Sequence, residues 1–401
     1  MKPVAIARKK RDCDRFLDKQ MTREEAIALR LSNQCLVGSP FEKPEEIVDW
    51  MGMMQAQDYT QFRWAIGMRM REPKMKAVKD SFSSGRLLRL HLLRCTVQTV
   101  TAEDYPWMLE LCSERNLRTI LSWPSYNQTD YSEQYHQEAT EALKEILSKG
   151  RCTANNQEAT STNATISLSK KEISEEMSKL GLPSDTAHLN PILLRGEIEG
   201  LLCSGEMKGK DATWALVANN AYVISTTESL ALLARKYFRS HSPASFEDFC
   251  WWTGLTITQN RQAIEQIASE LEEVQVGEQE MYIYQAPSYC DSQERPQHID
   301  SMKTDHQEHT VHLLPPYDEY LIGYKSRWIA LDKKYEAKAH NHFGIFKPVI
   351  LLDGKVVGNW KASHLQGAKA IETDIFTQKR EMGTRRLEKA KKLLQDFTTS
   401  R

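Results

Sequence analysis

The segment MMQAQDY (residues 53–59) lies between a predicted helix and the basic amphipathic stretch FRWAIGMRMREPKMKAVKD (62–80). Apolar side chains recur at helical spacing after Pro44, and proline favours the first turn of a helix. Gln55 and Gln57 therefore fall at the end of this helix or just beyond it. Residues two apart share a face only on an extended chain. A site that uses both amides thus requires extended backbone here.

Basic side chains gather between residues 63 and 94, where nine Lys and Arg residues face only Glu72 and Asp80. In a chain of formal net charge −1, this local excess favours a surface for an anion such as a phosphate backbone. Two plainer interpretations stay open. The basic residues can form an ordinary solvated face, and the two glutamines can be ordinary amides at a helix end.

A first unit, residues 1–120, is predicted to be a winged helix. Thr22 and Glu25 form a capping box that opens one helix, and the helix before the glutamines is the second. RLLRL (86–90) and RCTVQTV (94–100) are rich in branched residues and supply strands. Thr101 is the predicted N-cap of the next helix.

Two further units repeat this order of helix, turn, helix and hairpin. The second, residues 121–225, contains a capping box from Ser169 to Glu172 and a polar loop over residues 150–165. The third, residues 226–290, contains SPASFEDFCWWTGL (242–255) and a helix with Thr258 as its predicted N-cap. The repeat is one of pattern and not of sequence identity.

The C-terminal part, residues 291–401, begins with a polar linker and then changes to strands. Asp353-Gly354 between apolar runs is a strong signal for a type I′ hairpin, and KREMGTRRLEKAKKLLQDF (379–397) predicts a basic helix. The predicted fold class is therefore α+β, with three tandem winged-helix units followed by a small C-terminal β-barrel.

Composition restricts the class of protein. The chain has 401 residues, 40% of them hydrophobic and 27% charged, which is typical of soluble globular proteins. No apolar run reaches the roughly 18 residues that span a bilayer, and the N-terminus lacks a secretory signal pattern. The eight cysteines form no C-x-x-C pair. We expect a cytoplasmic monomer without a metal, a cofactor, disulfides or membrane contact.

Three ordered stretches carry a family resemblance. QAQDY (55–59) with RLHLLRCTVQTVTAEDYPWML (89–109), SPASFEDFCWWTGL (242–255) and HLLPPYDEYLIGYKSR (312–327) resemble the AlkZ/YcaQ-type winged-helix DNA glycosylases over nearly the whole chain. The resemblance implies a monofunctional enzyme that excises N7-alkylated guanine, including interstrand crosslinks, from duplex DNA. It implies that the Gln-x-Gln motif is catalytic. The family pattern often has glycine where Cys95 stands, which puts the local backbone in question.

The glutamines suit this chemistry. An N7-alkylated guanine is cationic and leaves as a neutral base, so excision needs no general acid. What remains is to stabilise an oxocarbenium-like sugar and to place a water, which amide oxygens can hold through hydrogen bonds. We assign Gln55 and Gln57 to this catalytic role.

Other side chains are assigned more broadly. Matches to the family and the basic excess together predict six DNA contacts: His91, Arg94, Thr96, Arg63, Arg69 and Arg89. The C-terminal stretch contributes three residues, either as internal structural pairs or as support for the site: Asp318, Tyr324 and Arg327.

Two alternatives to the enzyme stay open from the residues alone. A winged-helix transcriptional regulator would bind DNA, usually as a dimer on symmetric half-sites, and would not need Gln55 and Gln57. A protein-interaction scaffold is favoured only by the near-neutral overall charge.

Overall fold

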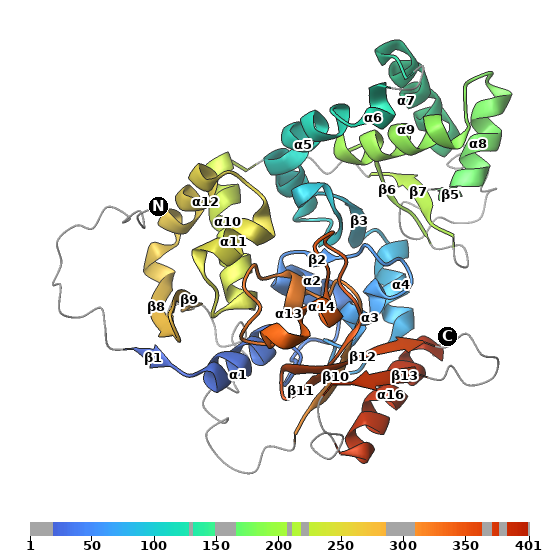
Figure 1. Ribbon diagram of the computed structural model, residues 1–401. Helices are drawn as coiled ribbons and strands as arrows, with labels where there is room; N and C mark the ends of the chain where they lie inside the picture. The colour runs from blue at the N-terminus through green and yellow to red at the C-terminus, as the bar shows by residue number, and fades with distance from the viewer. Residues whose placement is uncertain are drawn as a thin grey trace.

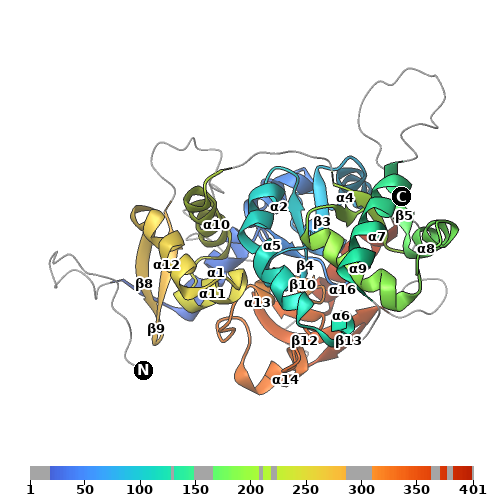
Figure 2. The same ribbon diagram turned by 90° about the horizontal axis from the view of Figure 1, so that it is seen from above.

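The chain is described by a computed structural model for residues 19–127, 131–148, 166–206, 211–217, 224–285, 309–362, 371–376 and 383–399. Figure 1 shows a central group of helices and strands from residues 44–101, with one group above it and another to one side. Seen from above, the two outer groups lie on opposite sides of the centre (Figure 2). The predicted loop over residues 150–165 and the linker after residue 290 lie outside the described residues.

The central group is built around a three-stranded antiparallel sheet of order β2-β4-β3. Pro44 opens its first helix, and Gly52, with φ of 79°, ends it. Glycine adopts this positive φ at low cost, so the chain leaves the helix directly into the short strand β2. The elements are α2 (Pro44–Met51), β2 (Met54–Gln55), α3 (Phe62–Gly67), α4 (Met75–Ser83), β3 (Leu87–His91) and β4 (Val97–Thr101).

The two outer groups have the same element order: helix, short strand, two helices and a hairpin. In the third group, the backbone bridge between Ala244 and Tyr282 stands in the place of the short strand. The second group contains α7 (Glu133–Ser148), β5 (Leu168–Ser169), α8 (Lys170–Lys179), α9 (Thr186–Ile198), β6 (Leu202–Ser204) and β7 (Thr213–Leu216), joined to the centre by α5 (Tyr105–Leu121) and α6 (Pro124–Asn127). The third contains α10 (Thr226–His241), α11 (Phe246–Thr253), α12 (Ile257–Gln266), β8 (Leu271–Val276) and β9 (Gln279–Tyr284).

The N-terminal helix does not belong to the central group, so its predicted place there is wrong. Strand β1 (Gln20–Met21) pairs in parallel with β8, and α1 (Arg23–Asn33) buries Ala26, Ile27 and Leu31 in a core shared with the third group and the C-terminal sheet. Of the two helices that we predicted for this unit, only α2, which precedes the glutamines, lies in the central group. The basic stretch forms two further helices there, α3 and α4.

The predicted C-terminal β-barrel is also wrong. The described strands form an open antiparallel sheet of order β10-β11-β12-β13, whose first and last strands do not pair. The Asp353-Gly354 turn is confirmed, with φ of 48° and 75°. The elements are β10 (Val311–Leu314), α13 (Glu319–Ile322), α14 (Glu336–Ala339), β11 (Val349–Leu352), β12 (Lys355–Ala362), β13 (Ile371–Ile375) and α16 (Thr384–Thr399).

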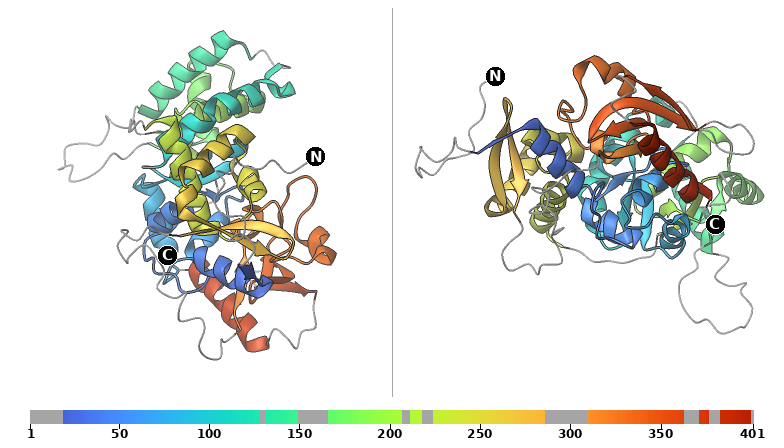
Figure 3. Two further views of the ribbon diagram at one scale, coloured as in Figure 1. Left: turned by 90° about the vertical axis from the view of Figure 1, so that its left-hand side faces the viewer. Right: turned by 90° about the horizontal axis from the view of Figure 1, so that it is seen from below.

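Helix α16 joins this sheet to the central group, as the view from below shows (Figure 3). Phe397 lies against Trp64 of α3 with ring centroids 5.2 Å apart, and Leu387 and Leu394 are buried in the same core. The sheet is thus fixed close to β2. Among the described residues, no helix is long and apolar enough to cross a membrane.

Helix caps test the local predictions. The capping boxes at Thr22 and Ser169 are both confirmed. The predicted caps at Thr101 and Thr258 are wrong: Asp104 precedes α5 and Thr256 caps α12. In the second case, Gln259 completes a capping box with Thr256, so the correct signal lies two residues earlier.

Candidate active site

Gln55 lies on β2, at the edge of the central sheet. It pairs with Gln98 of β4, and the next residue, Ala56, donates its N–H to the Val97 carbonyl at 2.9 Å. The backbone is therefore extended at Gln55, and the pairing with β4 continues through Ala56. An extended course through Gln57, which the use of both amides requires, would place Gln55 and Gln57 on one face.

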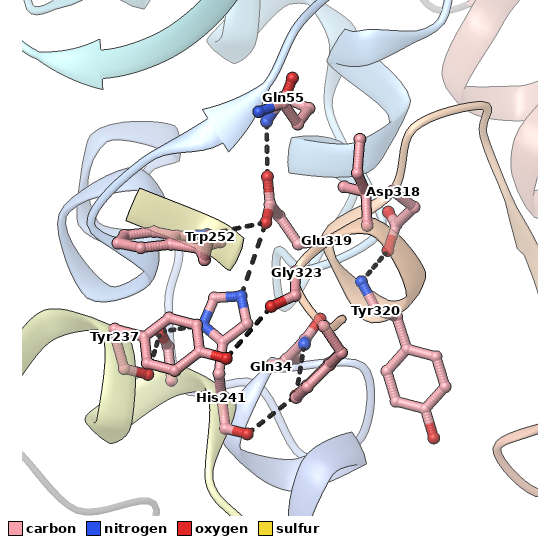
Figure 4. A network of polar contacts seen from close by, with 12 residues as sticks. Gln34, Gln55, Tyr237, His241, Trp252, Asp318, Glu319, Tyr320 and Gly323 are labelled. Carbon is pink, nitrogen blue, oxygen red and sulfur yellow. Dashed lines mark hydrogen bonds and ion pairs between the residues drawn. The ribbon is translucent and has the colours of Figure 1, made fainter. Parts of the chain in front are cut away.

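The outer edge of β2 is held by a buried carboxylate, Glu319, which is 1% exposed. Its Oε1 accepts the backbone N–H of Gln55 at 2.7 Å, and its Oε2 accepts the indole N–H of Trp252 at 3.1 Å (Figure 4). The edge of a sheet leaves such N–H groups without a strand partner. Glu319 supplies that partner and so fixes the backbone of the motif.

His241 completes the group around Glu319. Its Nε2 lies 3.5 Å from Glu319 Oε2, and its ring stacks on Tyr237 with centroids 4.7 Å apart. Burial lowers the pKa of His241 below its ordinary value of 6.5, although Glu319 acts in the opposite direction. The sequence assigned Asp318 to the site and missed Glu319. Both residues stand in the same quoted stretch, and only the three-dimensional fold separates their roles.

The amide oxygens on the Gln55 face lack hydrogen-bond partners. Gln55, which is 4% exposed, donates its Nε2 to Thr96 Oγ1 at 3.3 Å. Its Oε1 is buried without a partner, as are those of Gln57 and Gln98. Buried polar atoms are usually paired. Gln55 and Gln98 are direct partners on adjacent strands, and Gln57 follows two residues after Gln55. Unpaired acceptors of this kind can hold a hydrogen-bond donor such as water.

The segment from Leu92 to Thr96 is a hairpin turn and not the strand that we predicted. Arg94 has φ of 61° and Cys95 has φ of 54°, and two successive positive φ values are typical of a type I′ turn. Such values are unfavourable for side chains other than glycine, asparagine and aspartate. The glycine that the family often has at Cys95 fits this geometry.

Arg94 points into the protein. Its side chain lies against Gly254 at the end of α11, and its Nε and Nη2 are buried without partners. Burial lowers the pKa of Arg94, while the nearby Glu319 carboxylate acts in the opposite direction. Its predicted phosphate contact stays a prediction, and it requires this side chain to leave its present place.

The opposite face of the central sheet carries Arg89 and His91. Arg89 donates to the Ala56 carbonyl at 3.0 Å and to Ser204 Oγ at 3.1 Å. Glu197 Oε2 accepts the backbone N–H of His91 at 3.0 Å and lies 2.6 Å from its Nδ1. These contacts join the central and second groups, because Glu197 lies on α9 and Ser204 on β6. His91 and Arg89 are thus not on the face of the amides.

Arg69 is fully buried, so its predicted contact with DNA is wrong. Two of its bonds go to the carboxylate of Asp318, both at 2.8 Å. The Gln34 carbonyl, the Gln34 side chain and the Ala65 carbonyl accept the others. All five N–H donors of the guanidinium are therefore used. Arg69 and Asp318 instead hold the C-terminal part against the central group.

Part of the basic excess is neutralised locally. Four exposed cations each pair with a nearby acid: Arg71 with Glu42, Lys74 with Glu72, Lys76 with Asp80, and Arg86 with Glu45. Arg63 lies over the rings of Tyr59 and Phe62, at 6.0 and 5.7 Å from their centroids. The count of basic residues therefore overstates the charge available to DNA here.

Tyr324 and Arg327 make structural contacts. The Tyr324 hydroxyl accepts from Gln34 Nε2 at 3.0 Å and donates to the His241 carbonyl at 2.8 Å. Arg327 donates to the Leu321 carbonyl at 3.0 Å, and burial lowers its pKa to about 10. Neither residue pairs with Asp318. Within the described residues, no group of three His, Cys, Asp or Glu side chains could hold a metal ion.

The chain is similar to known proteins in both sequence and structure. The family described as "DNA glycosylase AlkZ-like" matches residues 48–390. The "Interstrand DNA cross-link repair glycosylase" of Streptomyces sahachiroi is 22% identical over 347 residues, covering 84% of this chain and 87% of that protein. The solved structure of the Streptomyces sahachiroi DNA glycosylase AlkZ superposes with a TM-score of 0.69 at 18% identity, covering 95% of this chain and 98% of that one.

Proposed function

Because the chain belongs to the AlkZ-like DNA glycosylase family, we propose that it excises N7-alkylated guanine, including interstrand crosslinks, from duplex DNA. The relative from Streptomyces sahachiroi bears the name of a crosslink repair glycosylase, which supports the crosslink as a substrate. Family membership favours an enzyme over the regulator and scaffold interpretations. The proposed enzyme acts as a monomer and leaves an abasic site.

One observation carries the mechanism: the carbonyl oxygens of Gln55 and Gln57 are buried and without hydrogen-bond partners. Alkylation at N7 makes guanine a cationic leaving group, so the enzyme need not protonate it. The two oxygens accept hydrogen bonds from a water and hold it near C1′ of the damaged nucleotide. Their partial negative charge also favours the positive charge that develops on the sugar.

The backbone around the motif keeps these oxygens in place. Glu319 fixes the Gln55 N–H on one side of β2, and β4 fixes Ala56 on the other. Held this way, the amides need little reorganisation when the sugar becomes charged, which is the main source of electrostatic catalysis. A buried carboxylate beside the motif adds a negative charge to a site that must accommodate a cation.

DNA binding falls to the three groups of shared element order, which we interpret as tandem winged helices around the motif. Arg63, Arg89 and Arg94 remain proposed DNA contacts near the lesion. His91 and Thr96, whose side chains bind groups of the protein, are proposed as structural supports. Because an interstrand crosslink joins two strands, neither guanine can be rotated alone into a deep pocket. The proposed reaction therefore takes place on a base that is still close to the duplex.

The test is single-turnover release of 7-methylguanine, and of one N7-guanine crosslink, from duplex DNA, followed by alkaline cleavage at abasic sites. We expect release from both substrates and none above the uncatalysed rate in the Gln55→Ala/Gln57→Ala double variant. DNA binding without release from either substrate would contradict the proposed function. Release from the monoadduct alone would exclude the crosslink as a substrate and would still support the glycosylase activity.

A further inference from the structure

The hydroxyl of Thr96 lies beneath both amides of the β2–β4 pair. Gln55 Nε2 and Gln98 Nε2 point at Thr96 Oγ1 from 3.3 and 3.2 Å. The same hydroxyl is 3.2 Å from the Leu93 carbonyl, which also accepts from Gln98 Nε2 at 3.1 Å. Four polar groups thus meet at the base of the hairpin turn.

The hydrogen-bonding capacities favour one orientation of these amides. A carbonyl oxygen only accepts, so Gln98 must face the Leu93 carbonyl with an N–H group. When the Thr96 hydroxyl donates its single hydrogen to Leu93, it accepts from both Gln55 and Gln98, and all four contacts are hydrogen bonds. If the Gln55 amide turned over, its oxygen would take this hydrogen, and the bond from Thr96 to Leu93 would be lost. The favoured orientation therefore points both carbonyl oxygens away from Thr96, and these are the oxygens without partners.

We propose that Thr96 is a positioning residue, which turns the carbonyl oxygen of Gln55 towards the reacting centre. Gln98 holds the Thr96 hydroxyl in the orientation that accepts from Gln55. The proposal rests on the function proposed above, since it concerns how the catalytic amide is oriented. Without the Thr96 hydroxyl, the Gln55 amide can rotate by half a turn and present N–H groups instead. An N–H cannot accept from water and repels a developing cation.

The geometry of the strands explains why Gln98 takes part. Gln55 and Gln98 are direct partners on β2 and β4, and Gln55 N–H goes to Glu319 instead of to β4. They are thus a non-hydrogen-bonded pair, in which side chains lie closest. Gln98 is fully buried, and both its N–H groups are used. It keeps the hydroxyl of Thr96 in the accepting orientation.

The experiment compares two threonines of one sheet in the full-length protein. Thr96→Val removes the orienting hydroxyl, whereas Thr99→Val, on the same sheet, removes a buried hydroxyl without a partner. We expect Thr96→Val to lower the single-turnover release of 7-methylguanine about tenfold, the size of one lost hydrogen bond. DNA affinity should stay unchanged. Thr99→Val should keep the wild-type rate, and Thr96→Ser should restore most of it.

Several outcomes would overturn the proposal. A Thr96→Val rate equal to that of the wild type would do so, as would equal losses in Thr96→Val and Thr99→Val. Failure of Thr96→Ser to recover the rate would show that shape and not the hydroxyl matters. If Thr96→Val does not fold, Gln98→Met takes its place, with a loss of at least about threefold expected on the same physical ground. An unchanged rate in Gln98→Met would then reject the proposal.

These results separate the two levels of inference. A wild-type protein that releases no base would contradict both the proposed function and the inference about Thr96. A wild type that is active and sensitive to Gln55→Ala, but insensitive to Thr96→Val, would end only the orientation of Gln55 by Thr96.

Discussion

The two faces of the β2-β4-β3 sheet differ in how their long polar side chains are paired. On one face, the amide oxygens of Gln55 and Gln98 are buried without partners. On the other, Arg89 and His91 are bound by groups of the second unit. Buried polar groups are normally paired, so the pairing of Arg89 and His91 is what we expect of a face that contributes only to stability. The unpaired amides identify the face where substrate binding is expected to supply the missing partners.

Loss of the amides should have the largest effect. Gln55→Ala and Gln57→Ala should each lower single-turnover base release about 100-fold, as for other groups that stabilise developing charge. His91→Ala, on the opposite face, should lower it less than about threefold. Equal losses for Gln57→Ala and His91→Ala would remove the distinction between the faces. DNA affinities measured by fluorescence anisotropy serve as the control for binding.

Removal of the carboxylate behind the amides should act on both rate and stability. Glu319→Ala leaves the Gln55 N–H and the Trp252 indole N–H without their acceptor. We expect the free energy of unfolding to fall by about 2 kcal/mol, measured by urea denaturation, together with a slower rate. Glu319→Gln keeps an acceptor oxygen and should lose less stability. A fully stable, fully active Glu319→Ala variant would contradict the role given to this carboxylate.

Loss of pairing on the Arg89 face should act mainly on stability. Glu197→Gln weakens the contact to His91 Nδ1 and keeps the shape of the side chain, so we expect a loss of about 1 kcal/mol. The rate at saturating enzyme should change little. Thermal unfolding and single-turnover kinetics on the same preparation test this. A large loss of rate in a stable Glu197→Gln variant would place chemistry on this face as well.

Acid should destabilise the protein through its buried imidazoles. Burial lowers the pKa of His241 and of His312 below the ordinary 6.5, so the unfolded chain binds protons at a pH where the folded chain does not. The free energy of unfolding therefore falls as the pH decreases below about 6.5. Urea denaturation at several pH values should show this slope. His241→Gln should make it shallower, and an unchanged slope in that variant would exclude His241 as a cause.

The smallest effect is expected from the exposed cations of α4. Lys76 pairs with Asp80 at 2.6 Å, but both side chains are more than half exposed. Such pairs contribute about 0.5 kcal/mol or less. Lys76→Ala should leave stability and base release close to wild type. A strong loss of DNA affinity in Lys76→Ala would instead support the basic DNA-binding surface that the sequence predicts.

Local signals predicted local structure well. The capping boxes at Thr22 and Ser169 and the Asp353-Gly354 hairpin each depend on neighbouring residues, and each is confirmed. The extended backbone at Gln55 followed from the end of the preceding helix. The caps predicted at Thr101 and Thr258 failed locally, because neighbouring residues take their place. The larger failures depend on distant partners. Nothing near Arg69 in the sequence indicates that Asp318 will bury it.

The site was predicted in part for the same reason. Gln55 and Gln57, whose catalytic role stays a prediction, could be named from their own segment. Glu319, which accepts the Gln55 N–H, is 264 residues further along the chain. The open C-terminal sheet was missed because alternating strands specify a sheet but not its closure. The turn at Arg94 and Cys95 lacks the usual glycine, so the strand signal of the flanking residues was extended across it.

The most direct test of this account is the rate of 7-methylguanine release by Gln57→Ala and His91→Ala, measured side by side at saturating enzyme. We predict that Gln57→Ala binds the lesion DNA like the wild type and releases about 100-fold less base, while His91→Ala stays within about threefold of the wild type. A normal rate in Gln57→Ala with a strong loss in His91→Ala would contradict it. The catalytic face of the sheet would then be the one that carries Arg89 and His91.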